Sequence, residues 1–157
     1  MYLYLKQKAF SWGDKFAVYD AAGNVRWYAY GDVFTWGRKL HVCDINSVER
    51  CFIRQRLMTW LPKYEIYIDG VLSTEVNRKF TFFTQEYTAD SLGWYVTGDV
   101  FAHDYMVTCG SYTVASVSKE WFSWGDAYAI NIADDRDEMA VLALVLAIDA
   151  TMADSQH

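Results

Sequence analysis

The chain has 157 residues, of which 53% are apolar and 18% aromatic, and a formal net charge of −6 at pH 7. This length fits one domain with enough apolar material for a core. The acidic balance argues against a partner that needs a broad basic surface, so no nucleic acid is expected as a partner. Three cysteines without a CxxC pair favour reduced thiols and a cytoplasmic protein.

Most of the chain alternates apolar and polar residues with a period of two, which is typical of half-buried strands. The runs at 15–20 and 25–30 flank a turn at 21–24. The runs at 63–68 and from Val71 flank Asp69-Gly70, which favours a hairpin because both turn positions tolerate a positive φ. We expect about twelve such short strands, which predicts an all-β fold.

Two motifs recur along the chain. Residues 27–34 return as residues 94–101. The repeats predict one closed, pseudo-symmetric domain over 1–157, with halves of roughly 1–60 and 61–132. Each Trp-Gly copy is interpreted as a strand-to-strand corner over which the aromatic side chains pack, and not as a ligand site. The three copies of this corner motif are Phe10-Ser11-Trp12-Gly13-Asp14, Phe34-Thr35-Trp36-Gly37-Arg38 and Phe122-Ser123-Trp124-Gly125-Asp126.

The C-terminal segment departs from the strand pattern. An uninterrupted apolar run from Met139 to Ile148 predicts a helix over 136–152, with Asp135 and Glu138 at capping-box spacing. The segment is apolar nearly all round, so burial on every side is expected. A membrane span needs about 20 apolar residues, and this segment is too short to be one. We therefore expect a helix that fills a closed barrel.

Asp149 is the anomaly of this helix, because a buried carboxylate is costly unless it is paired. Either it meets an arginine or backbone donors at the barrel mouth, or the helix has already emerged into water at this position. The second explanation is the simpler one. A catalytic role for Asp149 is not expected.

Three stretches, 6–14, 61–67 continuing to 78–80, and 119–126 continuing to 147–150, are similar to bacterial LURP-one-related proteins. That family belongs to the tubby C-terminal-like superfamily, which also includes the phospholipid scramblases. The resemblance implies a closed antiparallel barrel of about twelve strands around a central hydrophobic helix. Tubby proteins bind phosphoinositide headgroups through basic side chains, whereas LURP-one-related members have no settled activity as a group.

A basic cluster is the best candidate site. On a strand through 47–57, Arg50, Arg54 and Arg56 share one face, and the other face carries Cys51, Ile53 and Leu57. Arginines arranged in this way hold a phosphate with paired N–H donors. The alternative is a solvated strand face on which arginine discourages edge pairing. The predicted anion or lipid-headgroup site comprises Arg50, Arg54, Arg56, Lys63, Arg78 and Lys79.

Signals for catalysis or metal binding are weak. His41, Cys43 and Cys51 lack a fourth ligand with suitable spacing for zinc. A Cys109 nucleophile with His103 as its base has no supporting motif. Neither a Gly-rich phosphate loop nor a GxSxG motif is present. We therefore expect no cofactor, no bound metal and no enzymatic activity.

These observations favour a binding module, because a barrel plugged by its own helix leaves no large internal cavity for a substrate. The leading hypothesis is a non-enzymatic cytoplasmic protein, peripheral to a membrane, that binds an anionic lipid or a phosphate-bearing small ligand. The alternative is a regulatory or scaffold protein that binds another protein through aromatic surface or a strand edge. An enzyme with a surface cleft around His41, His103 or Cys109 is the least favoured of the three.

Overall fold

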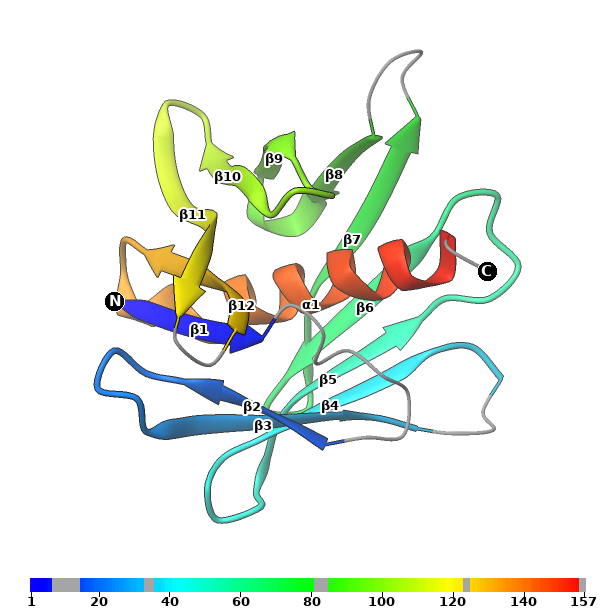
Figure 1. Cartoon of the computed structure of the whole chain (residues 1–157). Coiled ribbons are helices and arrows are strands. Elements are labelled where there is room, and N and C mark those ends of the chain that lie inside the picture. Colours follow the sequence, from blue (N-terminus) through cyan, green and yellow to red (C-terminus); the bar gives the residue numbers. More distant parts are fainter. Residues whose placement is uncertain (7–14, 33–35, 81–84, 123–124, 156–157) are drawn as a thin grey trace.

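The computed structural model describes residues 1–6, 15–32, 36–80, 85–122 and 125–155. The strands of these residues form one closed antiparallel barrel in which each strand pairs with its neighbours in sequence, and β12 closes onto β1 (Figure 1). This confirms the predicted all-β barrel. The strands are β1 (Tyr2–Lys6), β2 (Lys15–Tyr19), β3 (Val25–Gly31), β4 (Lys39–Cys43), β5 (Glu49–Gln55), β6 (Lys63–Ile68), β7 (Val71–Phe80), β8 (Gln85–Ala89), β9 (Trp94–Asp99), β10 (Asp104–Cys109), β11 (Tyr112–Phe122) and β12 (Gly125–Ile132).

The predicted hairpins form for the expected reason. Asp69 and Gly70 join β6 to β7 with φ angles of 49° and 81°, so both turn positions lie in the left-handed region. The turn between β2 and β3 is held by Asp20, whose Oδ1 accepts hydrogen bonds from the backbone N–H groups of Ala22 and Asn24, each at 2.9 Å. These local turns set the register of both hairpins.

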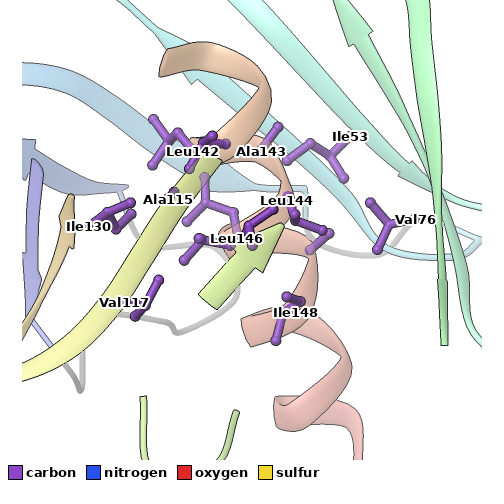
Figure 2. Packing of buried hydrophobic residues seen from close by; sticks show 14 of the residues in the cluster. Ile53, Val76, Ala115, Val117, Ile130, Leu142, Ala143, Leu144, Leu146 and Ile148 are labelled. Atoms are coloured by element: carbon purple, nitrogen blue, oxygen red, sulfur yellow. The ribbon is translucent and has the colours of Figure 1, made fainter. Parts of the chain in front are cut away.

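Helix α1 (Glu138–Ser155) runs along the inside of the barrel and supplies the centre of the core. Its leucines at 142, 144 and 146 have no more than 1% of their surface exposed. Each such side chain contributes about 1.5–3 kcal/mol when it is removed from water. No helix in the described ranges is long and apolar enough to cross a membrane. Figure 2 shows this core with Ile53, Val76, Ala115, Val117, Ile130, Leu142, Ala143, Leu144, Leu146 and Ile148 labelled.

The start of α1 differs from the predicted capping box. A short 3₁₀ helix, η2 (Asp135–Asp137), precedes α1, and the side chain of Asp134 caps it by accepting from the backbone N–H of Arg136 at 3.0 Å. The Glu138 carboxylate turns to the barrel wall, where it pairs with Arg26 and accepts from Trp27 Nε1 at 2.8 Å. Because these tertiary donors occupy Glu138, the prediction of an Asp135–Glu138 capping box is wrong.

The expectation that the helix has reached water at Asp149 is also wrong. Asp149 lies inside the barrel, and its Oδ1 is 3.1 Å from Nε2 of His103. Tyr128 donates to its other oxygen, and the rings of His103 and Tyr128 stack with centroids 4.2 Å apart. Burial and the nearby Asp149 charge raise the pKa of Tyr128 well above its usual value, so the phenol stays protonated and remains a donor. The carboxylate thus fastens α1 to β12 and to the β9–β10 connection.

The described parts of the repeats behave differently from one another. Trp27 on β3 and Trp94 on β9 occupy equivalent positions of the longer repeat, and both are buried. Gly37 has a φ of 74°, which agrees with the special backbone angle expected of the corner motif. Trp36, in contrast, is 87% exposed, so it does not pack over its turn as predicted. Residues 7–14, 33–35 and 123–124, which hold the first corner copy and parts of the other two, lie outside the described residues.

Charge is distributed unevenly along the barrel. Because consecutive strands are antiparallel, the β2–β3, β4–β5 and β6–β7 turns and the start of α1 share one end, here called the acidic end. The only basic side chains among the described residues of this end are Arg26, Arg50 and Arg136. The rest of the barrel, toward the end where α1 finishes, carries the other described lysines and arginines together with about as many carboxylates, Glu65 and Glu75 among them. The acidic residues of the acidic end are Asp20, Asp44, Glu49, Asp69, Asp90, Asp134, Asp135, Asp137 and Glu138.

Candidate functional site

The alternation predicted for the arginine strand is present in β5. Cys51 and Ile53 point into the barrel and are at most 1% exposed, whereas Arg50 and Arg54 lie on the outer face. The strand ends at Gln55, so Arg56 follows it and Leu57 does not continue the inner face. Leu57 is instead 49% exposed, which corrects its predicted placement.

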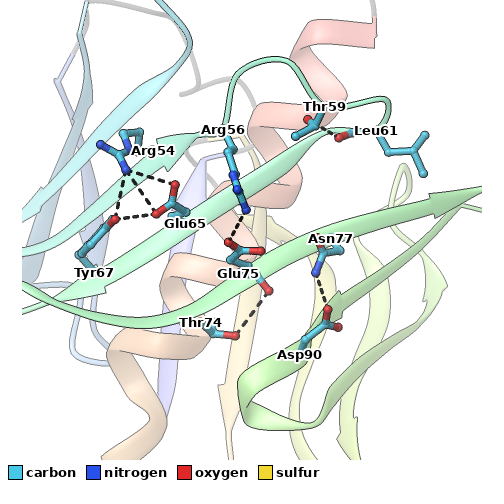
Figure 3. A network of polar contacts seen from close by, with 10 residues as sticks. All are labelled: Arg54, Arg56, Thr59, Leu61, Glu65, Tyr67, Thr74, Glu75, Asn77 and Asp90. Atoms are coloured by element: carbon cyan, nitrogen blue, oxygen red, sulfur yellow. Dashed lines mark hydrogen bonds and ion pairs between the residues drawn. The ribbon is translucent and has the colours of Figure 1, made fainter.

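The guanidinium groups of Arg54 and Arg56 are held by carboxylates of the neighbouring strands (Figure 3). Arg54 Nη2 lies 3.2 Å from Glu65 Oε1 and 3.2 Å from the hydroxyl of Tyr67. Arg56 Nη1 lies 3.1 Å from Glu75 Oε1. The Tyr67 hydroxyl donates to Glu65, and this bond together with Arg54 holds the pKa of Glu65 below its usual value. Each guanidinium has five N–H donors, so donors remain for a ligand.

These arginines face an open hollow of about 630 Å³ on the outer wall, here called the arginine hollow. Lys39 stands beside Arg54 across the β4–β5 pair and supplies a third cation. Among the described residues, no carboxylate lies within ion-pair distance of Lys39. An anion in the hollow would therefore meet three cationic side chains, Lys39 of β4, Arg54 of β5 and Arg56 of the segment that follows β5. The hollow is lined by Trp36, Lys39, Arg54, Gln55, Arg56, Leu57, Glu65 and Glu75.

The structure does not gather the whole predicted cluster at this hollow. Arg50 lies near the acidic end, where its Nε is 2.6 Å from Asp69 Oδ1, and this ion pair lowers the pKa of Asp69. Arg78 is 9% exposed and buried, so its expected place on an outer basic face is wrong. Lys63 begins β6, half-buried, and Lys79 is exposed near the end of β7. Neither lysine lines the hollow.

An exposed apolar cluster beside the hollow escaped the sequence interpretation. Trp60 and Met58 are fully exposed, and Trp36 and Leu57 join them. We call these four residues the apolar rim. The signal was available in Leu57-Met58-Thr59-Trp60-Leu61-Pro62, an apolar segment that has no strand alternation and ends at the only proline.

The two segments that carry the apolar rim are tied to each other. Gln55 accepts from the backbone N–H of Arg38 through its side-chain oxygen at 3.0 Å and donates its own N–H to the Arg38 carbonyl at 2.7 Å. Gly37 packs so closely that a Cβ there would lie 2.9 Å from Leu57 Cδ2. Met58 has a φ of 61°, in the left-handed region. These contacts join the β3–β4 and β5–β6 connections at the base of the rim.

The residues considered for metal binding or nucleophilic attack are not brought together. His41 lies on the outer wall between Asp32, at 3.0 Å, and Glu49, while His103 is buried with Asp149. Burial raises the pKa of the Cys51 thiol to about 12, so this sulfur stays protonated. Within the described residues no group of three His, Cys, Asp or Glu side chains is arranged so that it could hold a metal ion.

A second surface feature lies at the β1–β2 seam. Among the described residues the two strands pair at Tyr4 with Tyr19, whereas β1 pairs with β12 along its full length. Tyr4 and Phe122 make an edge-on aromatic contact with ring centroids 5.5 Å apart. The groove at the seam has a volume of about 320 Å³ and is lined by Tyr4, Lys6, Tyr19, Asp20, Ala21, Gly23 and Phe122.

The architecture defines a class of protein, a closed antiparallel barrel wrapped around its own C-terminal helix. Residues 1–149 match the LURP-one-related family, and the chain belongs to that family. It is 34% identical over 150 residues to YxjI of Bacillus subtilis (strain 168), an uncharacterized protein, with 96% of this chain and 93% of YxjI covered. An X-ray structure of a protein from Arabidopsis thaliana matches with a TM-score of 0.64 and 15% identity, over 96% of this chain and 90% of that one, which supports the fold alone.

Proposed function

We propose that the protein is a non-enzymatic binding module that recognises the phosphate group of an anionic phospholipid through the arginine hollow. The observation that carries this proposal is the convergence of Lys39, Arg54 and Arg56 on one open hollow. Arginine presents planar, paired N–H donors that match phosphate oxygens, and lysine adds a mobile point charge. The location that follows from this role is the cytoplasmic surface of a membrane, with the protein peripheral to it.

The carboxylates in the hollow are compatible with anion binding. Exposed ion pairs such as Arg56 with Glu75 are worth only about 0–1 kcal/mol, so exchanging that partner for a phosphate costs little. In the absence of ligand, Glu65 and Glu75 hold the two guanidinium groups over the hollow. Such preorganisation reduces the entropy lost when the ligand binds.

The uneven charge of the barrel also supports the proposal. The acidic end holds nine carboxylates and three arginines, which together account for the net charge of −6, so the rest of the chain, with eleven acidic and eleven basic residues, is close to neutral. An anionic surface repels the acidic end and attracts the hollow, which orients the barrel before contact. This resolves the conflict between an acidic chain and an anionic ligand.

The proposal is tested by co-sedimentation with vesicles of phosphatidylserine and phosphatidylcholine, compared with phosphatidylcholine alone, over a series of salt concentrations. We expect binding to the anionic vesicles at low salt that weakens as salt screens the charges. The Arg54→Gln/Arg56→Gln variant should bind at least about tenfold more weakly, a loss of about 1.4 kcal/mol. Arg50→Gln is the matched control, because it removes an arginine from the same strand outside the hollow.

Two outcomes contradict the proposal. One is no binding of the wild-type protein to anionic vesicles at low salt. The other is equal loss of binding in Arg50→Gln and in the double variant, which would show a general charge effect. A parallel titration with inorganic phosphate separates a site for free phosphate from a site that requires a membrane.

A second candidate function is protein binding at the β1–β2 seam, favoured by the groove that Tyr4 and Phe122 line there. An extended peptide in this groove would contact both aromatic side chains. Tyr4→Asp should then abolish binding of a defined protein partner that the Arg54→Gln/Arg56→Gln variant still binds. If Tyr4→Asp still binds the partner and the Arg54→Gln/Arg56→Gln variant does not, the seam is not the binding site.

A further inference from the structure

Three residues of the apolar rim have the most exposed large apolar side chains among the described residues. Met58 and Trp60 are fully exposed, and Trp36 is 87% exposed. Single exposed apolar residues are common, but adjacent ones rimmed by cations mark an interaction surface. The question is therefore which partner contacts the apolar rim.

We infer that the apolar rim inserts into the interfacial layer of the anionic membrane whose phosphate groups the arginine hollow binds; this inference rests on the proposed function. Trp36 and Leu57 line the hollow and also belong to the rim, so cations and apolar side chains share one surface. A lipid surface has the same arrangement, with phosphate groups next to the acyl boundary. Tryptophan in particular is enriched at that boundary.

The backbone at Met58 supports a functional role for the rim. A bulky residue is strained in the left-handed region, and here the strain presents an apolar side chain to water. Two polar groups of the loop are paired locally, since Thr59 donates to the Leu61 carbonyl at 2.8 Å and Arg56 N–H donates to the Lys63 carbonyl at 2.8 Å. These two groups stay paired when the loop enters a headgroup layer.

Charge complementarity favours a lipid surface over a protein as the occupant. Lys39, Arg54 and Arg56 stand next to the rim, while the carboxylates of the acidic end lie at the far end of the barrel. Lysine and arginine side chains close to an anionic leaflet are attracted by its negative surface potential. The hollow would then hold phosphate groups while the rim reaches the acyl boundary.

The test compares rim variants with hollow variants on the same phosphatidylserine–phosphatidylcholine vesicles. Met58→Ser and Trp60→Ser should each lower the apparent affinity about tenfold at every salt concentration, without changing the slope of affinity against salt. Arg54→Gln/Arg56→Gln should instead flatten that slope. Trp121→Ser is the matched control, because Trp121 is also exposed but lies on β11, away from the rim.

Brominated phosphatidylcholine, which quenches tryptophan within the acyl boundary, provides the second measurement. We expect quenching of the wild-type protein that falls measurably in Trp60→Phe and is unchanged in Trp121→Phe. If the rim variants bind vesicles as well as the wild type and Trp60→Phe leaves the quenching unchanged, the inference is overturned while headgroup binding stands. If the wild type does not bind anionic vesicles at all, the proposed function fails, and a protein becomes the partner to seek for the rim.

Discussion

Carboxylate side chains form polar contacts both in the interior of this barrel and on its outer wall, but the first are shielded from water and the second are exposed to it. In the interior, the Asp149 side chain is only 10% exposed and meets His103 and Tyr128. On the outer wall, Glu75 meets Arg56 where the arginine is half in solvent. Removing one partner in the interior leaves buried polar groups without a hydrogen bond, whereas an exposed pair exchanges with water at little cost. The interior contacts therefore contribute to stability, and the outer pairs are held only weakly.

Apolar side chains show the same contrast. Leu144 is fully buried against the barrel wall, whereas Met58 and Trp60 stand in water at the end where α1 finishes. Burial of Leu144 stabilises the fold, whereas Met58 and Trp60 contribute no burial to it. Substitutions in the two regions should therefore separate stability from binding.

Asp149→Ala should have the largest effect on the folded state. The substitution leaves His103 and Tyr128 buried without their acceptor, and we expect the free energy of unfolding to fall by about 1–3 kcal/mol for each group left unpaired. Urea denaturation followed by circular dichroism measures this loss. Asp149→Asn keeps the shape and an acceptor oxygen, so its loss should be smaller. A loss below about 1 kcal/mol in Asp149→Ala would mean that the buried cluster does not fasten the helix.

Leu144→Ala and Met58→Ala compare apolar truncation in the two regions. The interior change leaves a cavity in the barrel and should lower the free energy of unfolding by about 2–5 kcal/mol. The rim change should alter stability by no more than about 0.5 kcal/mol, because the side chain is already in water. Thermal and urea unfolding of both variants test the pair. Similar losses at the two sites would contradict the exposed position of the rim.

His41 should give a smaller, pH-dependent effect. Burial lowers its pKa, but its bonds to Asp32 and Glu49 outweigh burial and raise the pKa above the ordinary value of 6.5. The stability that His41 contributes is therefore fully present below pH 6.5 and is lost as the pH rises through the higher folded pKa. Wild type and His41→Gln should differ by under about 1 kcal/mol at pH 5.5 and by less at pH 8.5. A larger difference at pH 8.5 would reverse the sign of this linkage.

Local sequence patterns predicted the barrel and its helix well. Alternation within strands and the Asp69-Gly70 turn depend on neighbouring residues, and both formed as expected. The helix followed from one continuous apolar segment, although it begins at Glu138 and not at 136. Fold class is readable in this chain because each signal is local and all of them agree.

Long-range partners could not be read in the same way. Asp149 meets His103 from the β9–β10 connection, and Glu138 meets Arg26 from β3, across large separations in sequence. The candidate site was predicted in part: Arg54 and Arg56 share a hollow, but Arg78 turned inward. The direction of a side chain near a strand end depends on where the pairing with the neighbouring strands stops. The residue pattern of one strand does not show that position.

The central proposal is that the arginine hollow and the apolar rim face the membrane while the acidic end points away from it. The orientation of the barrel on a membrane tests this most directly. Cys109 is exposed near the acidic end, whereas Cys43 and Cys51 are buried, so one thiol is available for labelling there. A second protein, Met58→Cys in a Cys109→Ser background, places the same environment-sensitive fluorophore on the rim. With phosphatidylserine-containing vesicles, we predict enhanced, blue-shifted emission from the label at position 58 and unchanged emission from the label at Cys109. Equal responses at the two positions, or a response at Cys109 alone, would contradict the proposed surface.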